Sequence, residues 1–140
     1  MTQHQKELIK ISFAKMQPIA DAVSDLFYSR LFEIAPYTRP LFSDNIPEQG
    51  KKLIHGLSMV INSLDQLDDV FPTLRKLGSA HKTYGVTNAH YDIFASALLW
   101  TFERALGSDF TDDVRNSWIS LYVNVSEAMK KETEEVFLAA

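Results

Sequence analysis

The sequence predicts an all-α protein formed by a single domain. Apolar residues recur every three to four positions along most of the chain, which is the spacing of one face of an α-helix. No pair of strand-like stretches joined by an Asn-Gly type of turn is found. A chain of 140 residues can bury one core but is too short for two ordinary domains. We therefore expect six main helices and a short corner in one domain over residues 1–140.

Three of the helices are expected in the first half of the chain. Thr2 and Gln5 form a T-x-x-Q capping pattern before the first helix, and Pro18 interrupts the pattern after it. The second helix carries an apolar stripe over residues 19–32, and two prolines then turn the chain through a short corner that ends at Phe42. The segment 43–50 has the composition of a loop, with Pro47 just before the helical pattern of the third helix.

The second half is expected to contain the other three helices. The acidic residues at 65–69 are interpreted as a solvated connection to a short fourth helix. Pro72 suits the first turn of that helix and Gly85 ends it, as glycine commonly does just beyond a helix. Thr87 or Asn88 caps a longer fifth helix. A threonine followed by two aspartates opens the last helix, which is expected to fray into the charged C-terminal tail.

Composition excludes several classes of function. The net charge of −4 and the lack of a basic block argue against nucleic-acid binding. The first ten residues are too polar for a signal peptide, and no apolar run is long enough to cross a membrane. The absence of cysteine excludes disulfides, thiolate metal ligands and covalent cofactor attachment through cysteine. We expect a cytoplasmic protein without a membrane span.

The segment 71–86 carries the strongest candidate for chemistry. Leu74, Leu77 and His81 share one face of the expected short helix, so one imidazole stands on an apolar face. A histidine in this position is more often a hydrogen-bonded core residue than a ligand. Gln49 precedes His81 by 32 residues, on the helix before the acidic connection.

Two helices joined by a modest connection can place Gln49 and His81 on opposite walls of one pocket, which Tyr28 and Phe42 would close. A neutral imidazole is a natural ligand for haem iron, and a haem needs an apolar pocket with few polar groups. Spacing alone does not show that such a pocket exists.

The order and intervals of one set of residues resemble a known family, although no single member of the set is specific. The set comprises Phe27-Tyr28, Pro40-Leu41-Phe42, Gln49, Leu53, His81, Gly85-Val86 and His90-Tyr91. Over about residues 6–129 it resembles the bacterial single-domain globins and the globin domain of flavohaemoglobins. The resemblance implies a globin fold around non-covalently bound haem b and the gas ligands O2, NO and CO.

By position, the resemblance makes His81 the proximal iron ligand through Nε2, with Nδ1 bonded most simply to a carbonyl of its own helix. Phe42 matches the aromatic residue that wedges against the haem. The other haem contacts that it implies are Leu53 and Leu57 on the distal wall and Leu77, Val86 and Phe94 on the proximal wall. These are core residues in either interpretation, and Lys52 either reaches a propionate or is an ordinary surface lysine.

Tyr28 and Gln49 match the distal polar pair of the family. A gas ligand that draws electron density from iron accepts a charge-assisted hydrogen bond from a phenol, which is worth about 1.5–3 kcal/mol. Such a bond slows release roughly ten- to a hundredfold, and CO, which carries less charge, gains less. The alternatives are a core tyrosine bonded to a backbone carbonyl and a surface-facing glutamine.

The chain departs from the flavohaemoglobin pattern on the proximal side. Tyr91 matches the tyrosine of a network that includes a glutamate and the proximal histidine, but the glutamate position falls on Thr133, between Glu132 and Glu134. No reductase domain follows within the 140 residues. We therefore expect reversible oxygen binding, for transport, storage or scavenging.

Two alternatives to oxygen binding stay open. One is nitric oxide dioxygenation with a separate reductase, and the other is a haemless interaction or sensor domain, against which His81 counts. The sequence also leaves open whether Tyr28, Gln49 or His55 binds iron when no gas is present. It is compatible with a monomer or with a small homo-oligomer.

Overall fold

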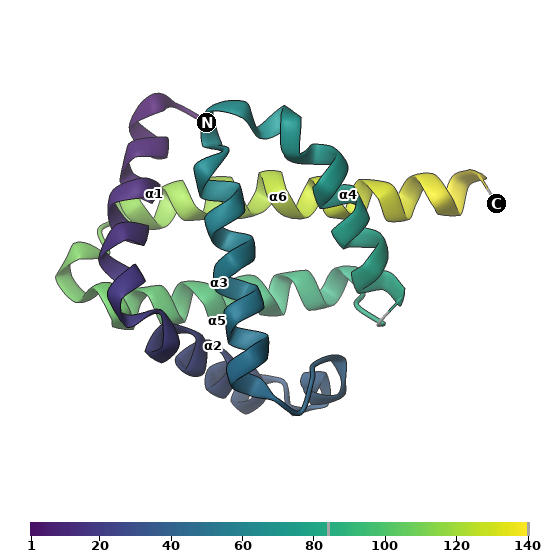
Figure 1. The fold of residues 1–140 in the computed structure, drawn as a ribbon, viewed down its shortest axis with the longest axis horizontal. Helices are drawn as coiled ribbons and strands as arrows, with labels where there is room; N and C mark the ends of the chain where they lie inside the picture. The colour runs from purple at the N-terminus through teal and green to yellow at the C-terminus, as the bar shows by residue number, and fades with distance from the viewer. Residues whose placement is uncertain (84, 140) are drawn as a thin grey trace.

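The structure, a computed structural model, describes the backbone of residues 1–83 and 85–139 and the side chains of residues 1–81 and 85–130. Over these ranges the chain forms six α-helices joined by short turns, without a strand (Figure 1). The helices are α1 (Gln3–Met16), α2 (Ala20–Ile34), α3 (Ile46–Asn62), α4 (Leu67–Thr83), α5 (Asn88–Leu106) and α6 (Asp112–Ala139). The 3-10 segments are η1 (Gln17–Ile19), η2 (Pro36–Leu41), η3 (Leu64–Gln66) and η4 (Gly107–Asp109). The predicted all-α fold with six helices and a short corner is confirmed.

Most helix ends follow the sequence signals. Thr2 and Gln5 form a reciprocal capping box at the start of α1. Thr87 is the N-cap of α5, and the Val114 N–H donates to the Thr111 side chain at 3.2 Å at the start of α6. Gly107 follows α5 with a φ of +57°, a backbone conformation that favours glycine.

Two helices begin earlier than expected, and one continues further. The Asn45 side chain accepts the Glu48 N–H at 3.2 Å, so α3 begins inside the segment that we interpreted as a loop. The acidic residues after η3 form the first turn of α4, where they face the positive end of the helix dipole. Pro72 therefore lies inside α4, although its ring removes one helical hydrogen bond. The helical backbone of α6 is continuous through the tail that was expected to fray.

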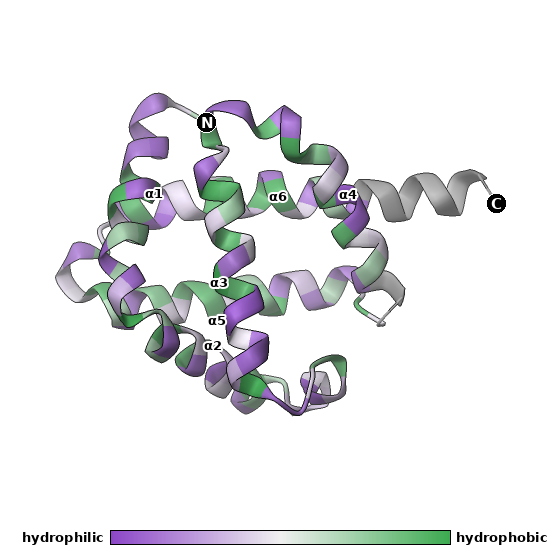
Figure 2. Cartoon of the chain, viewed as in Figure 1, coloured by the Kyte–Doolittle hydropathy of each residue, from purple (hydrophilic) through white to green (hydrophobic). Residues whose placement is uncertain are grey.

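The helices pack in crossed pairs. α4 crosses and packs on α6, α1 also packs on α6, and α2 packs against both α3 and α5 (Figure 1). α3 and α4 follow each other in sequence but hardly touch. Apolar and polar residues alternate along the helices (Figure 2), and the apolar ones supply the buried side chains. No helix among the described residues combines the length and the apolar character needed to cross a membrane.

Two groups of buried residues form the core. The larger group includes Ile9, Phe102 and Trp118 and lies where α1, α5 and α6 meet. Within it, the indole N–H of Trp118 donates to the Ser12 hydroxyl at 2.9 Å, so both buried polar groups are satisfied. The smaller group lies between α2 and α5 and contains Phe27, Tyr28, Leu31 and Ala97.

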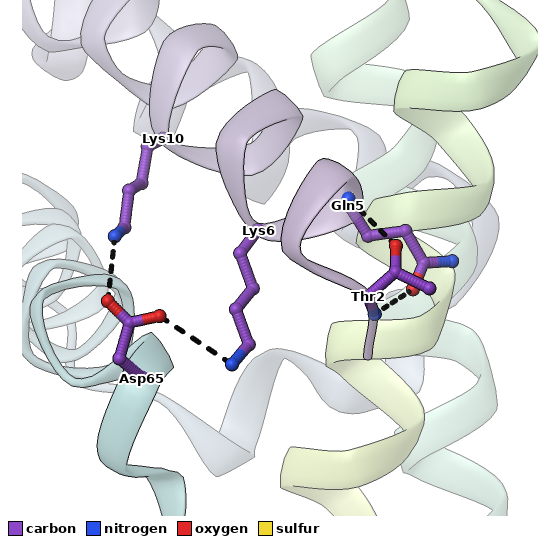
Figure 3. A network of polar contacts seen from close by, with 5 residues as sticks. All are labelled: Thr2, Gln5, Lys6, Lys10 and Asp65. Atoms are coloured by element: carbon purple, nitrogen blue, oxygen red, sulfur yellow. Dashed lines mark hydrogen bonds and ion pairs between the residues drawn. The ribbon is translucent and has the colours of Figure 1, made fainter.

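An ion-pair cluster ties the connection between α3 and α4 to α1 (Figure 3). The Asp65 carboxylate lies 3.3 Å from the Lys10 ammonium and 3.6 Å from that of Lys6. The hydrogen bond from Lys10 is the main cause that lowers the pKa of Asp65. The acidic connection is therefore held by α1 as well as solvated, although exposed pairs of this kind contribute little stability each.

Candidate functional site between α3 and α4

His81 lies near the end of α4, just before the chain turns back toward α5. The Val86 N–H donates to the His81 carbonyl at 2.9 Å, and Gly85 between them has a φ of +93°, which completes the turn that the glycine predicted. The imidazole is half-buried, and this burial lowers its pKa, so the neutral form is favoured.

The His81 side chain forms no hydrogen bond with the described residues. Its Nδ1 atom is buried and has no partner in the part of the chain that the structure describes, so the expected bond to a carbonyl of its own helix is not made there. A structural histidine in a core normally has hydrogen bonds. The neutral imidazole is thus a candidate ligand that forms no hydrogen bond with the described residues.

The residues expected to line a pocket with His81 are apolar but incompletely covered by the protein. Leu77 is 37% exposed, whereas Leu74, one turn earlier on α4, is 1% exposed. The other lining residues are partly buried; they are Phe42, Leu53, Leu57, Val86 and Phe94. Leu53 and Leu57 belong to α3 and Leu77 to α4, two helices that hardly touch, so both helices keep incompletely covered apolar surface. A flat apolar group bound between two helices would require such surface.

The structure brings some of these residues together and keeps others apart. Phe42, Leu53 and Phe94 pack against the buried group that contains Tyr28, whereas Leu57 packs against the larger core group. Leu77 and Val86 belong to neither group. A small apolar cavity among α1, η1, α2, α3 and α5 is a different feature and shares only Leu57 with the expected site. Its lining residues are Phe13, Met16, Gln17, Ala20, Val23, Ile54, Leu57 and Phe102.

Tyr28 is buried in α2 and is 3% exposed. Its ring lies edge-on against Phe27 and Phe42, with centroid separations of 4.9 and 5.4 Å. Burial raises the pKa of Tyr28 to about 12. The phenol is consequently a protonated donor throughout the neutral range.

Tyr28 and Gln49 are neighbours, but their side chains do not bond to each other. The Tyr28 hydroxyl donates to the main-chain carbonyl of Gln49 over a long 3.4 Å. The Gln49 side-chain oxygen instead accepts the Ser43 N–H at 3.2 Å. The amide is therefore oriented by the corner, with its oxygen occupied and its NH2 group without a partner among the described residues.

Tyr91 is buried in α5, and its hydroxyl donates to the sulfur of Met129 over 3.9 Å. The Tyr122 hydroxyl donates to the Tyr91 carbonyl. Burial raises the pKa of Tyr91, so this phenol also stays protonated. The side chains of Glu132, Thr133 and Glu134 lie outside the described residues. Sequence reasoning missed Met129 as the partner because a methionine on the apolar face of a helix has no feature that indicates it.

Among the remaining candidates, Lys52 and His55 are exposed on α3. His90 caps α5, since its Nδ1 accepts the Thr87 N–H at 2.9 Å. No group of three or more His, Asp or Glu side chains among the described residues is arranged to hold a metal ion. A metal bound at His81 therefore needs ligands that the described side chains do not supply, and a porphyrin supplies four nitrogens.

Comparison with known proteins agrees with this geometry. Residues 25–129 match the globin family. The chain is 32% identical to an anaerobic nitrite reductase of Casuarina glauca, over 94% of this chain and 91% of that protein. It is 29% identical to an anaerobic nitrite reductase of Gossypium hirsutum, over 99% and 94% of the two chains.

Among solved structures, the chain is similar to an engineered carbene transferase made from a Rhodothermus marinus protein described as a nitric oxide dioxygenase. The TM-score is 0.87 at 24% identity, over 99% of this chain and 97% of that one, which shows the shared fold. The two relatives named above are plant proteins, so the narrower resemblance to flavohaemoglobins stays a prediction. On the match of residues 25–129 and the relatives that span nearly all of it, the chain belongs to the globin family.

Proposed function

We propose that this globin holds haem b non-covalently between α3 and α4 and reversibly binds O2, NO and CO there. Globins normally bind haem. The observation that carries the proposal is the His81 imidazole, which is neutral, half-buried and free of hydrogen bonds with the described residues. When bound, the haem supplies a ferrous iron that takes a diatomic gas as its sixth ligand.

His81 is proposed as the protein ligand of the iron, through Nε2. Its lowered pKa keeps the lone pair of the neutral ring available near pH 7. Nδ1 has no acceptor among the described residues, so none of them draws its proton away, and the proposed ligand is an ordinary neutral imidazole. A neutral proximal ligand suits reversible binding better than oxygen activation.

The apolar side chains would enclose the haem faces and exclude water from them. Phe42, Leu53 and Leu57 are proposed for the distal face, and Leu77, Val86 and Phe94 for the proximal face. Each is incompletely covered by the protein, so each has apolar surface left for a flat ring to bury. Lys52 is exposed beside Leu53 and is proposed to meet a propionate at the rim.

Tyr28 is proposed to stabilise the gas ligand. Its phenol is protonated, and the 3.4 Å bond to the Gln49 carbonyl is long enough to be exchanged for a better acceptor. The NH2 group of Gln49 is a second donor, because the Ser43 N–H fixes the opposite end of the amide. Both donors would favour a gas ligand that carries partial negative charge.

Absorption spectra of the purified ferric, ferrous and CO-bound protein test this proposal. We expect a strong Soret band and a ferrous spectrum of five-coordinate haem with one histidine ligand. His81→Ala should lose this axial signature, whereas His4→Ala, which removes an exposed histidine at the start of α1, should keep it. Colourless protein that hemin does not reconstitute, or an unaltered spectrum in His81→Ala, would contradict the proposal.

A second candidate is nitric oxide dioxygenation with a separate reductase. The similar Rhodothermus marinus protein is described as a nitric oxide dioxygenase, and the plant relatives are named anaerobic nitrite reductases. Repeated NO consumption with an added reductase would favour this enzyme, whereas one stoichiometric burst would favour binding. The same comparison with nitrite under anaerobic conditions tests the activity for which the plant relatives are named.

Location and assembly complete the proposal. We propose that the protein works in the cytoplasm as a monomer or a small homo-oligomer. Fractionation of cells and light scattering of the purified haem protein test these two statements.

A further inference from the structure

The backbones of α4 and α6 touch at Gly78. A Cβ atom built on this buried residue would lie 2.2 Å from the carbonyl oxygen of Met129 and 2.8 Å from its carbonyl carbon and its Cα. All three are main-chain atoms of another helix, so a side-chain rotation cannot relieve the clash. Only glycine permits α4 to lie this close to α6 (Figure 1).

The other helical glycines are not under this constraint. A Cβ on Gly56 of α3 would meet nothing within 4 Å. On Gly50 it would meet the hydroxyl of Ser24 at 2.6 Å and the Cβ of Ser24 at 3.0 Å, which are side-chain and not main-chain atoms. Among the described residues, Gly78 is therefore the helical glycine that lies so close to the main chain of another helix that no side chain fits.

The other side of this contact is firmly held. Met129 rests against Gly78 through its main chain, while its sulfur accepts the hydroxyl of Tyr91 from α5 at 3.9 Å. The Lys130 ammonium lies 5.3 Å from the centre of the Tyr91 ring, and the Tyr122 hydroxyl donates to the Tyr91 carbonyl. The part of α6 that supports Gly78 is thus fixed to α5 as well.

His81 follows Gly78 by three residues, which is about 4.5 Å along the helix axis. α4 packs extensively on α6 and hardly touches α3, so the α6 contact decides where the end of α4 stands. We propose that Gly78 and Met129 form a positioning contact that sets the place of the His81 imidazole at the haem site. The inference rests on the proposed function, since it concerns how the proposed iron ligand is placed.

The structure gives the size of the displacement that would follow if the contact were filled. Restoring an ordinary van der Waals separation between the new Cβ and the Met129 oxygen requires the backbones to part by about 1 Å. Ligand geometry at functional sites is usually held within about 0.5 Å. The imidazole of Gly78→Ala would therefore be out of place for bonding to iron, and hemin dissociation should rise about ten- to a hundredfold.

The test compares Gly78→Ala with Gly56→Ala by resonance Raman spectroscopy of the ferrous protein. The iron–histidine stretching band should shift to lower frequency in Gly78→Ala and stay in place in Gly56→Ala. An unshifted band in folded Gly78→Ala overturns the proposal. A wild-type protein without an iron–histidine band instead refutes the proposed function, so the two failures are distinguishable.

A second background separates positioning from a general loosening of the fold. In His81→Gly with imidazole added to the solution, the iron ligand is no longer attached to α4. Gly78→Ala should then leave the iron–imidazole band unchanged, and a shift as large as that in the His81 protein overturns the proposal.

If Gly78→Ala does not fold, Met129→Ala decides the question. This variant keeps the main chain that faces Gly78 but releases α6 from the Tyr91 hydroxyl. Because the main-chain contact with Gly78 remains, the iron–histidine band should stay in place in the folded Met129→Ala protein. A shifted band would show that the methionine side chain, and not the main-chain contact, positions His81, and it would overturn the proposal.

Discussion

Replacing Tyr28 with phenylalanine removes one hydroxyl and leaves the ring in place. The edge-on contacts with Phe27 and Phe42, at 4.9 and 5.4 Å between centroids, do not involve the hydroxyl and should survive. The Gln49 carbonyl that accepts this hydroxyl lies in α3, where helical hydrogen bonding still serves it. The substitution therefore changes what the site offers to a gas ligand more than it changes the packing.

The expected magnitude follows from two hydrogen bonds. A charge-assisted bond from the phenol to the gas ligand is worth about 1.5–3 kcal/mol. To form it, the Tyr28 hydroxyl must leave the Gln49 carbonyl, and that bond is long at 3.4 Å, so about 0.5 kcal/mol is given up. The difference of about 1–2.5 kcal/mol corresponds to a change of about 5- to 70-fold in O2 affinity.

Stopped-flow measurement of O2 release checks this value. Tyr28→Phe should release O2 about 5- to 70-fold faster than the wild type, with a much smaller change for CO. Tyr37→Phe is the matched control, because that tyrosine lies on the corner and is 64% exposed. An O2 release rate within about twofold of the wild type, or equal acceleration of O2 and CO, would refute the reasoning.

Three further predictions concern stability. The pKa of Tyr28 is raised to about 12, so the contribution of the neutral phenol to the free energy of unfolding is complete below the ordinary tyrosine pKa of about 10 and is lost as pH rises further. Because phenylalanine does not ionise, circular dichroism should show that Tyr28→Phe unfolds at a higher alkaline pH than the wild type. The pKa of Asp65 is lowered, so the contribution of its carboxylate to the stability of the fold is lost as pH falls below about 4. The difference in Tm between wild type and Asp65→Asn should therefore vanish at that pH. Ser12→Ala leaves the buried indole N–H of Trp118 without an acceptor and should cost about 1–3 kcal/mol in urea denaturation; a loss below about 0.5 kcal/mol would contradict this.

The local chemistry of the chain was enough to predict where several helices begin and end. Thr2, Thr87 and Thr111 cap the helices that their spacing predicted, because an N-cap depends on residues within one turn. The start of α4 was predicted too late, because Pro72 was taken as a first-turn signal. The acidic turn before Pro72 and the burial of Leu74 against α6 extend that helix in spite of the proline.

For the site, the contacts of the candidate residues could not be predicted from the sequence. The resemblance paired Tyr28 with Gln49, and the two residues are neighbours in the structure, but the Gln49 amide bonds to a main-chain N–H of the corner. Such a bond depends on how the corner folds and leaves no trace in residue types. The same holds for Gly78. In the sequence it is only a residue of low helix propensity, whereas in the structure it allows the main chain of Met129 on α6 to pack directly against α4.

The independent support of α3 and α4 has a consequence for assembly of the holoprotein. α3 rests on α2 and α4 rests on α6, while Asp65 anchors their junction to α1. Neither helix depends on the other for its support, so a haem can enter between them without refolding either helix. The rate of hemin binding to newly made apoprotein should then be limited by the collision of hemin with the protein and its entry between the helices. We expect one kinetic phase whose rate depends on hemin concentration, with little change in helix content.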